Sequence, residues 1–156
     1  MRAWGLLVLR LAVGTVFIAH GLPKLIPIWG SSPAEAAAFF QSIGLHPAYP
    51  LTAASGVIET GGGLMVIFGL FATWAALGLL IDTAVAIWKV HLAHGFFINW
   101  TMARGVGHGI ELHLLLSGAL ICLMMTGPGL LSIAGRRERD AEEQALARAR
   151  LRSNKV

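Results

Sequence analysis

Two carboxylates in apolar surroundings are the residues of this 156-residue chain most suited to proton chemistry. Glu59 lies within the hydrophobic run from Leu51 to Leu70, just before the glycine triplet at 61–63, and Glu111 lies at the start of another run. A carboxylate at the centre of a membrane-spanning helix costs about 2 to 4 kcal/mol to insert, so it normally faces protein and often marks function. We therefore predict that Glu59 and Glu111 relay protons.

Four basic side chains near the ends of apolar runs are predicted to bind a ligand above Glu59: His20, Lys24, His91 and His108. His20 and Lys24 are four residues apart, a spacing that places both on one helix face. Their nitrogens can donate hydrogen bonds to the carbonyl oxygens of a bound molecule. The alternative is structural, with histidines that pack helices together and a lysine that extends to the lipid head groups.

The spacing of these groups does not indicate a metal site. Di-iron bundles use a Glu from each of two helices and Glu-x-x-His from each of two others, whereas this chain has only the reversed His108-x-x-Glu111. His113, two residues after Glu111, is expected to point elsewhere. Haem held by two histidines from different helices stays open, although no spacing supports it.

Arg10 and Asp82 are two further charges deep in apolar segments. At 1.5 Å per residue, each lies about 10 to 13 Å from the same membrane surface, within reach of a long arginine side chain. We predict a structural ion pair between Arg10 and Asp82, or between Arg10 and Glu59. Arg10 is expected to face protein rather than lipid.

The composition is that of an all-α integral membrane protein. Hydrophobic residues make up 56% of the chain and charged residues only 13%, and the mean hydropathy is +0.70. About 20 apolar residues form a helix that crosses a hydrocarbon core of about 30 Å. We predict a four-helix membrane domain over residues 1–135, followed by a charged tail over residues 136–156. The expected spans are 3–22, 51–70, 74–92 and 109–126.

A short amphipathic helix is predicted in the first outer loop. Ser32-Pro33-Ala34-Glu35 has the N-cap, the proline at the first helical position and the reciprocal acceptor of a helix start. Ala36, Phe39, Phe40 and Ile43 then recur at helical spacing on one face. This helix should lie on the membrane surface or over the mouth of the bundle.

The charged tail suggests the orientation of the chain. Residues 136–156 hold seven of the twelve Lys and Arg residues and four of the eight acids, which accounts for +3 of the net charge of +4. Basic residues beside membrane spans favour the cytoplasmic side, so both termini are expected in the cytoplasm of a bacterial cell, with the protein in its inner membrane. Anionic lipid, rather than nucleic acid, is the expected partner of the tail.

Six short motifs lie along the chain in a fixed order. They are Leu9-Arg10-Leu11, His20-Gly21-Leu22-Pro23-Lys24-Leu25, Glu59-Thr60-Gly61-Gly62-Gly63-Leu64, Gly69-Leu70, Gly109-Ile110-Glu111 and Gly127-Pro128-Gly129. In their order and spacing they resemble the DoxX family of small four-helix membrane proteins. The resemblance covers about residues 6–133, and the family's usual acid after the final Gly-Pro-Gly is absent from Ser132-Ile133-Ala134.

The resemblance implies two classes of function, and a third is considered beside them. Relatives include the quinone-reducing membrane subunit of a thiosulfate:quinone oxidoreductase and a membrane component of an oxidative-stress complex, so we expect a quinone-linked oxidoreductase subunit. More distant relatives resemble assembly chaperones, so the alternative is a non-enzymatic partner that stabilises other membrane-associated proteins. A carrier or exporter, which would require a homo-oligomer, is the third possibility.

The chain offers no redox chemistry of its own. Its single cysteine, Cys122, cannot form an internal disulfide, and the sequence has no flavin or nicotinamide motif. If the protein is an oxidoreductase subunit, a partner redox protein or an added cofactor must supply the electrons. Whether the chain is catalytic therefore stays open at this point.

Overall fold

The computed structural model describes residues 2–153, and this part of the chain is helical without any β-strand. A single isolated bridge joins Ile28 and Ser31. The helices are α1 (Arg2–Leu25), α2 (Pro33–Ser42), α3 (Ala48–Phe68), α4 (Ala72–Ala86), α5 (Glu111–Thr126) and α6 (Ile133–Ser153). A π-helical turn (Ile87–His91) and a 3-10 turn (Leu92–His94) extend α4.

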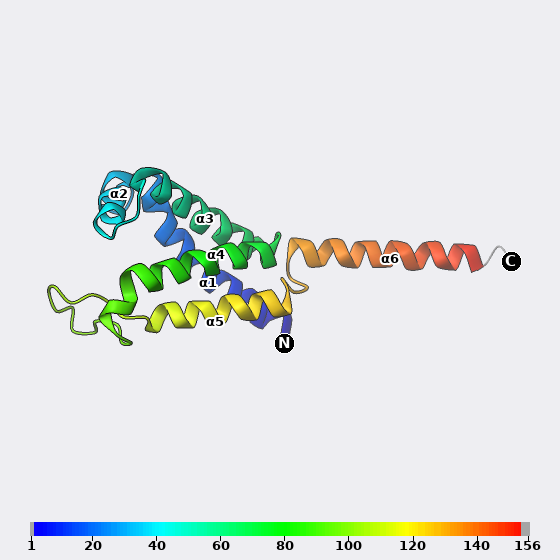
Figure 1. The fold of residues 1–156 in the computed structure, drawn as a ribbon. Helices are drawn as coiled ribbons and strands as arrows, with labels where there is room; N and C mark the ends of the chain where they lie inside the picture. Colours follow the sequence, from blue (N-terminus) through cyan, green and yellow to red (C-terminus); the bar gives the residue numbers. More distant parts are fainter. Residues whose placement is uncertain (1, 154–156) are drawn as a thin grey trace.

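The predicted all-α membrane bundle is confirmed. Three helical segments are long and apolar enough to cross a membrane, Ala3–Leu25, Ala48–Phe68 and Ala72–His94, and α5 is a shorter apolar helix. α1, α3, α4 and α5 form the bundle, α2 lies at one end, and α6 projects away from the other (Figure 1). The first helix continues past Pro23 instead of ending at residue 22.

Glycines bring α1 and α3 into backbone contact. A Cβ atom on Gly63 would lie 2.8 Å from the carbonyl oxygen of Gly14, and one on Gly21 would lie 2.7 Å from the amide nitrogen of Thr60. Such distances leave no room for a side chain, so only glycine permits this approach. The antiparallel contact, which we call the α1–α3 seam, places the end of α1 beside the middle of α3.

The hydrophobic core lies between the four bundle helices. Its fully buried members include Val66 from α3, Leu79 from α4, and Leu120 and Leu123 from α5, with Phe17 of α1 packed among them. Leu79 occupies the space left by Gly62, where an added Cβ would lie 2.9 Å from the leucine Cγ. The glycine triplet thus accommodates α4 on one side as well as α1 on the other.

The helix predicted in the first loop is present as α2. The backbone N–H of Glu35 donates to Ser32 Oγ at 3.3 Å, so the N-cap forms as expected. Glu35 Oε2 accepts from the Ser32 hydroxyl at 3.0 Å, in place of the Ser32 backbone N–H of a complete capping box. Gly44, with a φ of +76°, follows the helix and provides the left-handed residue that ends it.

Arg10 does not form the predicted ion pair with Asp82 or Glu59. Its guanidinium is buried, only 2% of the residue being exposed, and donates to the carbonyl oxygens of Ile67 at 3.0 Å and Leu131 at 2.9 Å, and also to that of Pro128. The last carbonyls of a helix have no intrahelical partner, which makes them available acceptors. Arg10 therefore ties α1 to the end of α3 and to the segment after α5.

We predict opposite effects for the same substitution at two neighbouring glycines. Gly63→Ala pushes a methyl group into the α1 backbone and should destabilise the bundle by about 1 to 3 kcal/mol. Gly61→Ala is the matched control, because a Cβ there has no neighbour within 4 Å and alanine favours the helix. Thermal unfolding in detergent, followed by circular dichroism, measures both. Equal melting temperatures for the two variants would contradict the close contact.

Candidate functional site

A cavity of about 300 Å³ lies at the α2 end of the bundle. One wall is the apolar face of α2, and the other walls carry polar side chains from α1, α3, the α4 segment and α5. The α2 residues are Ala36, Phe39, Phe40 and Ile43, and the polar residues are His20, Lys24, Ser55, Glu59, Asp82, Lys89, His91 and His113. The predicted position of α2 over the bundle mouth is therefore correct.

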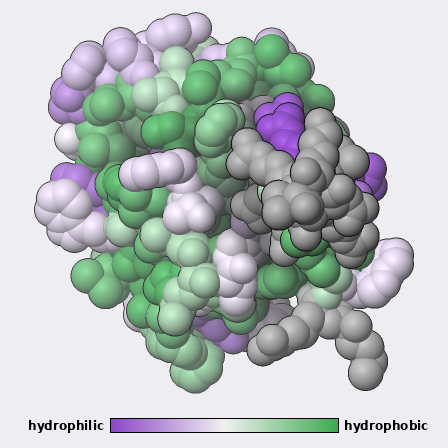
Figure 2. All heavy atoms as spheres, turned by 90° about the vertical axis from the view of Figure 1, so that its right-hand side faces the viewer, coloured by the Kyte–Doolittle hydropathy of each residue, from purple (hydrophilic) through white to green (hydrophobic). Residues whose placement is uncertain are grey.

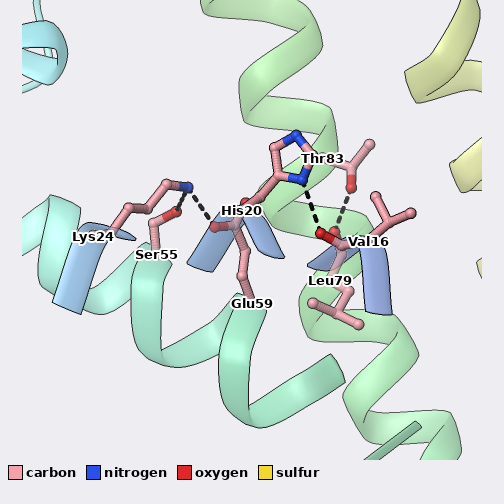
Figure 3. A network of polar contacts seen from close by, with 7 residues as sticks. All are labelled: Val16, His20, Lys24, Ser55, Glu59, Leu79 and Thr83. Atoms are coloured by element: carbon pink, nitrogen blue, oxygen red, sulfur yellow. Dashed lines mark hydrogen bonds and ion pairs between the residues drawn. The ribbon is translucent and has the colours of Figure 1, made fainter. Parts of the chain in front are cut away.

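Lys24 and Glu59 form the ion pair at the centre of this cavity. Lys24 Nζ lies 2.5 Å from Glu59 Oε2 and donates to Ser55 Oγ at 2.8 Å (Figure 3). Glu59 is buried, with 7% of the residue exposed. The ring of Phe40 covers the lysine, 5.7 Å from Nζ to the ring centroid. Lys24, rather than Arg10, is thus the cation that balances Glu59.

The α1–α3 seam brings these residues opposite each other. His20 and Lys24 are one turn apart on α1, and Ser55 and Glu59 are one turn apart on α3. Gly56 lies between Ser55 and Glu59 on α3. A Cβ atom added to Gly56 would lie 2.9 Å from the Cβ of Lys24. The lysine stem therefore lies directly against the α3 backbone, and its ammonium group reaches the carboxylate without crossing lipid.

The π-helical turn explains how Asp82 and His91 reach one cavity. In a regular α-helix, nine residues at about 100° each place two side chains on opposite sides. Both residues nevertheless line the cavity, because the wider turn at Ile87–His91 rotates the end of the α4 segment. Such turns often occur at functional sites. His91 is held in place by a contact of 2.7 Å between its Nδ1 and the carbonyl oxygen of His108.

His113 lines the cavity and Glu111 does not, so the two side chains point in different directions, as their spacing predicts. The His113 ring lies against that of His91, with centroids 3.8 Å apart and planes tilted by 31°. Residues two apart on a helix differ by about 200° in direction, so the faces of Glu111 and His113 are nearly opposite. Of the two, His113 is the one beside the cavity, although Glu111 was the one predicted to relay protons.

Glu111 and His108 hold the loop between α4 and α5 and do not line the cavity. Glu111 Oε2 accepts a hydrogen bond from the backbone N–H of Ile98 at 3.1 Å, and His108 Nδ1 accepts one from that of Asn99 at 3.1 Å. Both side chains therefore satisfy loop amides. The structure thus places both side chains in the loop, and the proton relay expected of Glu111 and the ligand binding expected of His108 stay predictions.

A second, smaller cavity of about 40 Å³ adjoins the first. The two share His20, Glu59, Asp82 and His113, and Thr83 contributes only to the smaller one. Thr83 donates its hydroxyl to the carbonyl oxygen of Leu79 at 2.7 Å (Figure 3). The carboxylates of Glu59 and Asp82 thus face the same small polar space beneath the main cavity.

The charges that line the main cavity cancel formally, because Lys24 and Lys89 are balanced by Glu59 and Asp82. A neutral ligand can therefore enter without leaving a net charge buried. Within the described residues, no three His, Cys, Asp or Glu side chains are arranged to hold a metal ion. The groups that are present can donate hydrogen bonds and transfer protons.

Sequence reasoning missed Ser55 and underrated Asp82 and Lys89 as members of this site. Ser55 lies four residues before Glu59, so its position on the same helix face was available from spacing alone. Asp82 was predicted to pair with Arg10 because the two lie at similar depths in the membrane. Depth alone does not show which way a side chain points around the helix axis. The π-helical turn carries no sequence signal that could have corrected this.

The fold and the cavity define a small integral membrane protein with a polar site enclosed by its helices. The chain belongs to the DoxX family, whose profile matches residues 5–92. It is 32% identical over 128 residues to an uncharacterized membrane protein of Mycobacterium tuberculosis, covering 80% of this chain and 76% of that protein. An uncharacterized protein of Haemophilus influenzae is 30% identical over 128 residues, 82% of this chain and 87% of that protein. No solved structure matches the chain significantly.

Removing one partner of the ion pair should cost more than removing both. Lys24→Met leaves the Glu59 carboxylate buried without a cation and is expected to destabilise the protein by about 3 kcal/mol. Lys24→Met combined with Glu59→Gln should recover most of that loss, because no buried charge then remains unpaired. Denaturation in detergent measures the cycle. Strictly additive losses would show that the two side chains do not interact.

Loss of the Glu111 carboxylate should loosen the loop and leave the cavity intact. Glu111→Ala removes the acceptor for the Ile98 amide, and trypsin should then cleave faster after the exposed Arg104. Glu111→Gln keeps an acceptor oxygen and serves as the control, with cleavage close to that of the wild type. Mass spectrometry identifies the cut. Unchanged cleavage in the alanine variant would contradict the loop-holding role.

Proposed function

We propose that the protein is a quinone-binding, quinone-linked oxidoreductase subunit that works with a partner electron donor. The observation that carries this proposal is a formally neutral cavity with proton-transferring groups on one side and an aromatic, apolar helix face on the other. A quinone ring is neutral, flat and largely apolar, with two carbonyl oxygens that accept hydrogen bonds. The cavity offers both kinds of surface in one place.

Lys24 is the proposed donor to one quinone carbonyl. An ammonium group has three N–H bonds, and two of those of Lys24 are directed to Ser55 and Glu59. The third remains for a ligand. His20 Nδ1 donates to the carbonyl oxygen of Val16 at 2.8 Å, which leaves Nε2 of the neutral ring to accept a hydrogen bond from a quinol hydroxyl in the cavity. The ring itself would pack against Phe39 and Phe40 of α2.

Reduction of a quinone to a quinol consumes two electrons and two protons. The protons would come through Glu59, with Asp82, His91 and His113 as further proton-transferring groups around the same space. The electrons would come from a partner redox protein. In the proposed orientation, with both termini in the cytoplasm of an inner-membrane protein, the cavity opens toward the outer side.

The isoprenoid tail of the quinone would leave between α2 and α4. α2 packs chiefly against α3 and α1, so it does not close this side. The cavity wall there is apolar, with Phe39 and Ile43 on α2 and Val85 and Val90 on the α4 segment. A hydrocarbon tail can pass these side chains into lipid without displacing a polar contact.

A groove between α1 and α5 supports the second candidate, a non-enzymatic partner of other membrane proteins. It has a volume of about 560 Å³ and is lined by Gly5, Leu6, Leu9, Cys122 and Thr126. Small residues let a further transmembrane helix approach closely. If this is the function, loss of the protein lowers the abundance of a partner while the purified protein binds no quinone.

Quinone binding should depend on the carboxylate in the cavity and not on the one in the loop. The protein in mild detergent is titrated with a short-chain ubiquinone while tryptophan fluorescence is followed. Glu59→Gln releases Lys24 and should weaken binding about tenfold or more, whereas Glu111→Gln, the matched control, should bind like the wild type. Absence of binding by the wild type, or equal loss in both variants, would overturn the proposal.

A further inference from the structure

A second groove lies at the other end of the bundle, where α6 begins. It has a volume of about 280 Å³ and is formed by the turn between α3 and α4, the segment after α5 and the start of α6. Leu70, Phe71, Trp74 and Pro128 make its walls largely apolar, and Arg137 of α6 contributes a cation. Neither the DoxX resemblance nor the proposed quinone site assigns a role to this groove.

The walls of this groove are held in place by buried contacts. Gly69 has a φ of +67°, and a Cβ on it would lie 3.1 Å from Pro128 Cβ, so the turn after α3 packs tightly against the segment after α5. Arg10 donates to the carbonyl oxygens of Pro128 and Leu131 from below. The groove is therefore a fixed feature of the bundle.

The rim of the groove has the character of a membrane interface. Phe71 and Trp74 are 73% and 72% exposed, and exposed aromatic rings of this kind are typical at the boundary between hydrocarbon and head groups. In the view along α6, most of the surface that the grey atoms leave visible is hydrophobic (Figure 2). Arg137 lies where this apolar surface gives way to the charged α6.

Arg137 is the cation that lines the groove. The neighbouring Arg139 is engaged, donating to the carbonyl oxygens of Gly135 at 3.3 Å and Leu130 at 3.2 Å. Among the residues whose contacts are described, no acidic side chain forms an ion pair with Arg137, although Asp140 lies one turn further along α6. A guanidinium beside an apolar groove matches a phosphate group attached to a hydrocarbon chain.

We infer that this groove binds an anionic phospholipid. The phosphate contacts Arg137, and the first part of an acyl chain lies along Leu70, Trp74 and Pro128. A soluble phosphate would use the cation but not the apolar walls, so a lipid is the occupant that both features favour. Such a lipid would join α6 to the bundle at the membrane surface.

Native mass spectrometry of the full chain tests this site. The protein is mixed in detergent with phosphatidylglycerol or with zwitterionic phosphatidylcholine, and the bound lipid is counted. Phosphatidylglycerol should bind preferentially, and Arg137→Gln should weaken its binding about fivefold. Arg148→Gln, further along the same helix, is the control that removes the same charge away from the groove, and it should bind like the wild type.

Three outcomes would overturn the inference. Equal binding of the two lipids by the wild type would remove the role of the headgroup charge. An equal loss in Arg148→Gln would indicate diffuse attraction by the whole tail. Displacement of phosphatidylglycerol by an equal concentration of inorganic phosphate would show that the site recognises a free anion. None of these results depends on whether the other cavity binds quinone.

Discussion

The close approach of α1 and α3 is the constraint on which the rest of the structure depends. Gly14 and Gly21 on α1 and Gly56 and Gly63 on α3 remove the side chains that would keep the two backbones apart. Only at this distance can Lys24 reach Glu59 from the end of its own helix. A buried carboxylate without that cation would be too costly to retain. The ion pair therefore depends on the close helix contact at the seam.

The cavity follows from the same arrangement at the next level. The seam fixes His20 and Lys24 on one wall, the π-helical turn rotates His91 onto another, and α2 covers the opening with its apolar face. At the opposite end, Arg10 joins α1, α3 and the segment after α5 through backbone carbonyls. Charged side chains thus hold the bundle together at both ends, and the α2 end encloses the polar side chains of the candidate site.

The spacing of nearby residues predicted the helices and much of the cavity lining. The contacts between side chains far apart in the sequence could not be predicted in this way. The N-cap at Ser32 and the apolar face of α2 are set by neighbouring residues, and both are present as predicted. Arg10 was predicted to pair with Asp82 because their depths in the membrane are similar. Its actual partners are backbone carbonyls, and the spacing of side chains in a sequence cannot indicate those. Glu111 was favoured over His113 because charge in an apolar run is conspicuous, while the rotation of α5 depends on packing against α4.

Light-activated labelling with an azido-quinone, mapped by mass spectrometry, tests whether the cavity beside Lys24 and Glu59 receives a quinone. If it does, labelling should be confined to two peptides, one from Phe39 to Ile43 and one from Val85 to Val90, and excess unlabelled quinone should suppress both. Labels spread along the lipid-facing residues of α5, or labelling that excess quinone leaves unchanged, would contradict quinone binding in this cavity.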